Sequence, residues 1–203
     1  MDQKYKVMIF VSALALVYIA VFYLVPNALD NFAFVPGKIL SEPWRLFTFP
    51  FVHVNTWHLW ENVASIILIG FLAIELKTEF YDLVVLYLSA SVLAVMPVFL
   101  ISHFSAAGAS AAIYAGFGII AQDLAKYKIM PAIPIALLTL SIFARSFTSI
   151  FDCGFSLCES LIFSLRQGFA HFSGLVFGTV GYSYMNNHTL NPNSILRGVA
   201  AGK

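Results

Sequence analysis

The 203-residue chain is 60% hydrophobic and only 10% charged, with a mean hydropathy of +0.86. Soluble domains are about one quarter charged, so this composition excludes a soluble globular protein and indicates a polytopic membrane protein. The net charge of +1 leaves no basic patch for nucleic acid and no acidic tail. Two cysteines, Cys153 and Cys158, are too few for a disulfide framework.

Six apolar segments predict six helices, and no strand alternation, repeat or low-complexity stretch interrupts them. They span roughly residues 7–25, 57–76, 83–101, 109–124, 129–150 and 167–184. The first follows Lys4 and Lys6 in the charge order of a signal peptide. Because it is long and lacks a clear small-residue cleavage site, we expect a retained helix. The pattern predicts an all-α fold: one transmembrane six-helix bundle over residues 1–203.

The basic residues between the segments predict an orientation. With the N-terminus inside, the cytoplasmic side carries Lys4, Lys6, Lys77, Lys126, Lys128, Arg197 and Lys203, against Lys38, Arg45, Arg145 and Arg166 outside. This bias places both termini in the cytoplasm of a multi-pass cell-membrane protein. The first loop, roughly 26–56, then lies outside, and its many Phe, Pro and Trp residues suit the lipid interface. The two cysteines fall in the outer loop before the sixth segment, where a disulfide could form but is not required.

The fourth segment is shorter than the ~20 residues that cross a bilayer. A polar run, 102–107, leads into it at Gly108-Ala109-Ser110-Ala111. A short helix fed by such a loop would place Ser110 in a wet pocket below the membrane surface. The alternative is that Ser110 simply caps its helix, as serine often does.

Polar residues within apolar segments are candidates for function. His58 and Asn62 lie four residues apart and share a helix face, whereas Glu61 points about a third of a turn away from Asn62. In a six-helix bundle these two residues, Ser110 and His171 all fall in the outer half of the membrane. The alternative is that a buried His or Asn only hydrogen-bonds a neighbouring helix.

The sixth segment carries His171, followed by Gly174-x-x-x-Gly178, a spacing typical of close helix packing. A serine needs a base to become a nucleophile. His171, a histidine at membrane depth on a late helix, could serve as that base. No Asp or Glu lies within the sixth segment, or in the fourth before Asp123, so the residues favour a Ser-His dyad. His58, Asn62 and the backbone N–H of Ser110 could stabilise an oxyanion.

These residues resemble the rhomboid intramembrane serine proteases of the basic six-helix type, over about residues 44–184. The resemblance rests on five motifs: Trp44-Arg45; His53, His58 and Asn62; Gly108-Ala109-Ser110; Tyr114; and Ala170-His171-x-x-Gly174-x-x-x-Gly178. Where the family has glycine after the serine, this chain has Ala111, which we expect to modulate activity. Glu75 lies near the position at which many members of the family have an acidic residue.

The resemblance implies an endopeptidase that cuts transmembrane or membrane-adjacent segments of other proteins, with Ser110 as nucleophile and His171 as general base and acid. It implies no metal or cofactor, and it implies membrane-protein substrates in the lipid bilayer. Tyr114 would pack on His171, and the fifth helix, with Phe147 and the loop to Arg166, would be the gate. Two alternatives stay open: an inactive relative that binds membrane helices, and a small transporter or channel lined by the intramembrane His and Asn.

Overall fold

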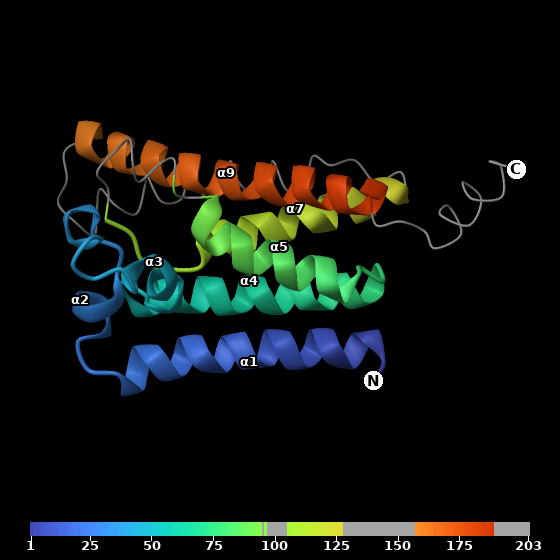
Figure 1. Ribbon diagram of the computed structural model, residues 1–203, viewed down its shortest axis with the longest axis horizontal. Coiled ribbons are helices and arrows are strands. Elements are labelled where there is room, and N and C mark those ends of the chain that lie inside the picture. The colour runs from blue at the N-terminus through green and yellow to red at the C-terminus, as the bar shows by residue number, and fades with distance from the viewer. Residues whose placement is uncertain (95, 97–104, 128–156, 189–203) are drawn as a thin grey trace, which may run out of the picture.

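The computed structural model describes residues 1–94, 96, 105–127 and 157–188 (Figure 1). Five long helices run roughly along one axis: α1 (Gln3–Leu24), α4 (Thr56–Glu75), α5 (Phe80–Leu93), α7 (Ser110–Lys126) and α9 (Leu157–His188). These described ranges contain no strand; they contain one isolated antiparallel bridge between Phe34 and Ala106. The all-α prediction is confirmed for them. The predicted helix 129–150 lies outside the described residues, so the six-helix bundle stays a prediction.

Two of the described helices are long and apolar enough to cross a membrane. They are α1, with a mean hydropathy of 2.6, and α4, with 1.5. The α7 helix has 17 residues, which is shorter than a full crossing requires. The predicted short fourth helix is therefore present, and it begins at Ser110.

The predicted start of the last helix, at residue 167, is wrong. The α9 helix begins at Leu157 and runs for 32 residues. Arg166 was expected in the loop before this helix, but no Gly or Pro lies between Leu157 and Gln167 to end a helix. Arg166 and Cys158 therefore lie in α9, and Cys153 lies outside the described residues.

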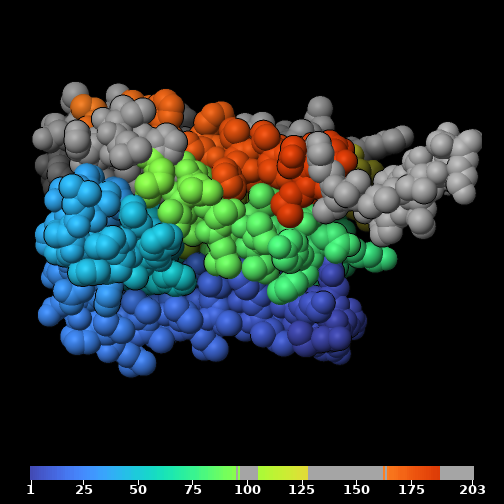
Figure 2. Space-filling model, in the orientation of Figure 1, coloured from blue at the N-terminus to red at the C-terminus, as the bar shows by residue number. Residues whose placement is uncertain are grey.

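The first loop contains four short helical pieces instead of an irregular connection: α2 (Ala28–Phe32), η1 (Pro36–Lys38), α3 (Arg45–Thr48) and η2 (Phe49–Phe51). Figure 2 shows this part of the chain gathered at one end of the molecule, and Figure 1 places the N-terminus at the other end. Several large apolar side chains here are exposed: Leu40, Trp44, Phe47 and Val54. Such side chains suit the predicted place in the lipid interface.

The central helix is α7, which contacts α4, α5 and α9. Every residue from Ala111 to Ala121 is buried. Small residues make this possible: Gly116 packs on the Ile69 side chain of α4, and Gly118 packs on the backbone of α9 at Leu175. Close approach of this kind is how membrane helices gain contact area. The fold therefore fixes the depth and direction of α7, and with them the position of Ser110.

Candidate active site

Ser110 is the first residue of α7. The residue that caps the helix is Ala109, and no side chain makes a capping hydrogen bond there. The alternative that Ser110 merely caps the helix is therefore wrong. The first turn of a helix leaves its N–H groups without intrahelical partners and carries a partial positive charge. The partly buried Ser110 therefore lies at the end of the helix where an oxyanion would be stabilised.

Gly108 shapes the backbone just before Ser110. Its φ of +107° lies in the left-handed region that favours glycine, and its N–H donates to the Phe49 carbonyl at 2.9 Å. A Cβ at this position would overlap the imidazole ring of His58. His58, which is 5% exposed, therefore lies directly against the backbone two residues before Ser110. The structure brings this predicted site residue to the start of α7.

Asn62 is buried one turn after His58, on the same face of α4. Its Nδ2 donates to the His58 carbonyl at 2.6 Å, so one of its two N–H groups serves its own helix. Glu61 lies apart from this face and accepts a hydrogen bond from the Trp57 indole at 2.9 Å, on the exposed side of α4. Asn62 thus retains one donor for a ligand, and Glu61 is not part of the site.

His53, which the motif placed with the second helix, lies in the loop before α4 begins at Thr56. Its buried ring lies 5.3 Å from the Tyr18 ring and 5.2 Å, edge to face, from the His58 ring. Burial lowers the pKa of His53 to about 4, against a smaller opposing effect of the Phe51 backbone. His53 is therefore neutral at pH 7, and it packs behind His58 rather than facing Ser110 directly.

His171 lies on α9 and stacks on Tyr114 of α7. The two ring centroids are 4.4 Å apart and the planes are inclined by 21°. Tyr114 is four residues after Ser110, which places it one turn along the same face of α7. His171 is 7% exposed. The stacking fixes the imidazole beside the first turns of α7.

Two glycines of α9 set its depth against α7. A Cβ on Gly174 would overlap the Ala111 carbonyl oxygen, and a Cβ on Gly178 would overlap that of Ala115. The two pairs have the same offset, so α7 and α9 run parallel. The same offset aligns His171 with Gly108. Gly108 precedes Ser110 by two residues, so His171 and Ser110 differ by about 3 Å in position along the axis. The glycine pair therefore acts in packing, as its spacing indicated, and this packing brings the His171 and Ser110 levels together.

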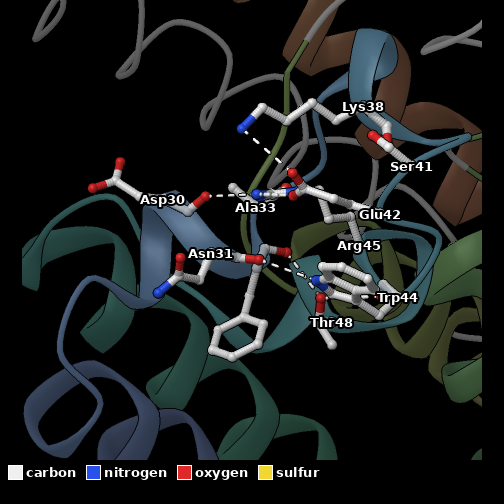
Figure 3. A network of polar contacts seen from close by, with 10 residues as sticks. Asp30, Asn31, Ala33, Lys38, Ser41, Glu42, Trp44, Arg45 and Thr48 are labelled. Atoms are coloured by element: carbon white, nitrogen blue, oxygen red, sulfur yellow. Dashed lines mark hydrogen bonds and ion pairs between the residues drawn. The ribbon is translucent and has the colours of Figure 1, made fainter.

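The Trp44-Arg45 pair organises the first loop (Figure 3). Arg45, 2% exposed, donates to the carbonyls of Ala33 and Asp30, each at 2.8 Å, and pairs with Glu42. Trp44 donates from its indole to the Asn31 carbonyl at 3.3 Å. Arg45 thus joins α2 to α3. The pair is a structural anchor for the loop that carries Phe49, the residue bonded to Gly108.

We expect Arg45→Ala to destabilise the protein by about 3 kcal/mol, since it removes a buried, hydrogen-bonded charge. Lys38→Ala is the matched control. Lys38 also pairs with Glu42, but half of its side chain is exposed, so its loss should cost less than about 1 kcal/mol. Thermal melts of both variants in detergent test this. Equal melting temperatures would contradict the anchoring role.

Two groups of polar residues were not singled out from the sequence. Asp123, considered only as the end of the fourth segment, is buried and accepts from Thr78 at 2.5 Å and from Tyr182 at 2.9 Å. It fastens α7 to α9 and to the turn after α4, at the end opposite Ser110. Glu75, which lies near the acidic position of many family members, is exposed. The second group is Ser164 and Gln167: Ser164 lies before the predicted start of the last helix, and Gln167 is the first residue of that predicted helix but was not considered as a candidate.

The family model for the Rhomboid domain matches residues 40–187 of the chain. This range contains every motif of the resemblance: the Trp-Arg pair, His53, His58 and Asn62, Ser110, and the α9 histidine with its two glycines. Among curated protein sequences, none matches the chain. Rhomboid proteins are membrane proteins, and the family is generally one of intramembrane serine proteases. The chain belongs to the rhomboid family.

Proposed function

We propose that the protein is an intramembrane endopeptidase that uses Ser110 and His171 as a catalytic dyad. The observation that carries the proposal is the packing of α9 on α7, in which Gly174 abuts Ala111 and His171 stacks on Tyr114. In this packing His171 is aligned with Gly108, about 3 Å along the axis from Ser110, and this closeness supports the dyad. A hydroxyl and an imidazole that can serve as its base are the minimum that nucleophilic catalysis requires.

In the acylation step, Ser110 Oγ attacks the substrate carbonyl carbon while His171 takes the hydroxyl proton. The N–H of Ser110, the free N–H of the Asn62 amide and the His58 ring hold the oxyanion. When the tetrahedral intermediate collapses, the C–N bond breaks and His171 returns the proton to the leaving amine. The fragment on the carboxyl side of the cut departs, and the other fragment remains as an ester on Ser110.

The substrates would be transmembrane or membrane-adjacent segments of other proteins. A peptide bond within a helix is hydrogen-bonded to its own helix and is inaccessible to a nucleophile, so the segment must unwind locally to reach Ser110. Residues that weaken a helix, such as Gly and Pro, should therefore lie near the cut. Because Ser110 lies at the end of the molecule that carries the first loop, cleavage should occur in the outer half of the cell membrane, with both termini of the protease in the cytoplasm.

The direct test is cleavage of a labelled model transmembrane substrate by the purified protein in detergent. The Ser110→Ala variant is the negative control. Cleavage by the parental protein and none by the variant would support the protease. A folded parental protein that neither cleaves nor labels with a serine-directed probe would instead indicate an inactive relative that binds membrane helices.

We expect His58→Ala and Asn62→Ala to lower kcat more than they weaken substrate binding, because an oxyanion donor acts mainly in the transition state. Loss of one donor in soluble enzymes costs about 10²–10³ in kcat. One N–H of Asn62 is already donated to the His58 carbonyl, and a backbone amide also stabilises the oxyanion. Loss of Asn62 should therefore lower kcat by about 10²-fold or less. Loss of His58 should lower kcat further, because its ring also packs against Gly108.

The two variants should be measured for cleavage and for labelling by a small serine-directed probe on the same preparations. Labelling should survive, more slowly, because Ser110 and His171 remain. Parental cleavage rates in both variants would show that α4 is structural and that backbone groups alone hold the oxyanion.

A further inference from the structure

Phe34 and Phe49 form a buried aromatic pair on the inner side of the first loop. Phe34 follows α2, and Phe49 begins η2. Their rings meet edge to face, with the centroids 5.8 Å apart. Both side chains are buried, whereas Phe47 of the same loop is exposed. The pair therefore faces the helices and not the surroundings of the protein.

The backbone of the same two residues holds the chain that leads to Ser110. Phe34 exchanges two hydrogen bonds with Ala106, at 2.8 and 3.0 Å, and the Phe49 carbonyl accepts from the N–H of Gly108 at 2.9 Å. These contacts lie four and two residues before Ser110. The first loop thus fixes the path of the chain up to the proposed nucleophile.

Ala111 makes the contact on the other side of Ser110. It is buried in one apolar cluster with Phe34 and Phe49, which we call the loop cluster. The carbonyl of Ala111 abuts Gly174 of α9. The residue after the nucleophile is therefore held from two directions, through its methyl group by the first loop and through its carbonyl by α9.

The loop cluster also reaches the chain neighbour of the proposed base. Ala170 packs against the cluster, and it directly precedes His171 in α9. One small apolar cluster thus contacts the residue after Ser110 and the residue before His171. A change in its packing would alter the position of one proposed catalytic residue relative to the other.

We propose that Ala111, Phe34 and Phe49 are positioning residues that hold Ser110 in its productive place, an inference that rests on the proposed protease function. Each acts through the chain on either side of Ser110. A glycine in place of Ala111 has no methyl group and could not pack into the loop cluster. The alanine, by which this chain departs from the family, therefore supports the site, and Ala111→Gly should lower activity although it restores the family residue.

The expected loss follows from the packing of one methyl group. Without it the first turn of α7 can shift, and the rate falls with the fraction of molecules that keep the productive arrangement. Loss of one buried methyl group is enough to change such an equilibrium about tenfold. We expect Ala111→Gly to lower kcat about tenfold and to leave KM close to its parental value. Labelling by a small serine-directed probe, which needs no substrate binding, should slow by the same factor.

Ala115→Gly is the matched control. Ala115 lies one turn farther along α7 and is also buried, and its carbonyl abuts Gly178 as that of Ala111 abuts Gly174. It packs in a cluster with Ala90 of α5 instead of the first loop. Because glycine weakens a helix interior, this variant should lose at least as much melting temperature as Ala111→Gly. Its kcat and its labelling should stay near the parental values.

Phe49→Leu tests the same contact from the first loop. The change removes the ring and keeps the backbone carbonyl that accepts from Gly108, and it should lower kcat by a similar factor. Because both changes loosen one contact, Phe49→Leu combined with Ala111→Gly should be no slower than the slower single variant. Combined with Ala115→Gly, which lies in a different cluster, it should be as slow as Phe49→Leu alone.

Cleavage kinetics, probe labelling and thermal melts on the same preparations decide the matter. Parental kcat and labelling in Ala111→Gly would overturn the inference. A change confined to KM would also overturn it, because Ala111 would then contact the substrate. Independent losses that multiply in the combined Phe49→Leu and Ala111→Gly variant would show that the two residues do not share a contact, with the same consequence. A parental protein that neither cleaves nor labels would instead overturn the proposed function, and this inference with it.

Discussion

Ser110→Ala and His171→Ala are each expected to abolish cleavage while the helical bundle persists. Removing the nucleophile leaves nothing to form the ester, and removing the base leaves a hydroxyl that ionises poorly at neutral pH. In soluble serine proteases such losses reach about 10⁴–10⁶ in kcat. Neither side chain anchors the bundle as Arg45 anchors the first loop. His171 loses its stacking on Tyr114 in the variant, so we expect a modest fall in melting temperature there and almost none for Ser110→Ala.

The double variant provides the sharper test of the dyad. Residues that act as one unit are not additive, so Ser110→Ala with His171→Ala should be no worse than either single change. The measurement is cleavage of the model substrate, with circular dichroism and thermal melts as folding controls. Cleavage that survives in Ser110→Ala would rule out Ser110 as the nucleophile.

Much of the site could be predicted from the sequence because its spacing reflects helix geometry. His58 and Asn62, four residues apart, lie on one buried face of α4, and Gly174 and Gly178 meet α7 as their spacing indicated. The short fourth helix was predictable because Gly108 precedes it and its apolar run is too brief to span a bilayer. Local periodicity therefore located the elements that carry the site.

The remaining features depend on contacts between distant segments, which spacing does not encode. Arg166 was expected in the loop before the sixth helix, yet α9 begins at Leu157, and Ser164 then lies on the same face of the helix as His171. Arg45 is buried because the carbonyls of Ala33 and Asp30 fold back to accept from it. Asp123 is buried because Thr78 and Tyr182, both far away in the sequence, donate to it.

Gly174→Ala and Gly178→Ala are expected to force α9 away from α7. At each position the added Cβ would overlap a backbone carbonyl oxygen, that of Ala111 or that of Ala115, and the backbone of the buried α7 helix cannot yield as a flexible side chain would. Overpacking of this kind costs about 1–3 kcal/mol. Both variants should therefore melt at clearly lower temperatures than the parent. Gly37→Ala is the control, because a Cβ there meets nothing within 4 Å.

The two variants should differ in activity, because His171 lies three residues from Gly174 and seven from Gly178. A displacement of about 1 Å at a catalytic group can cost about 10²-fold in rate, so Gly174→Ala should lose about that much activity or more. Gly178→Ala should retain more of it at a comparable loss of stability. Cleavage rates at a temperature where both variants are folded make the comparison. Parental activity in Gly174→Ala would mean that the depth of α9 against α7 does not position the base, and the geometric argument for the dyad would fail.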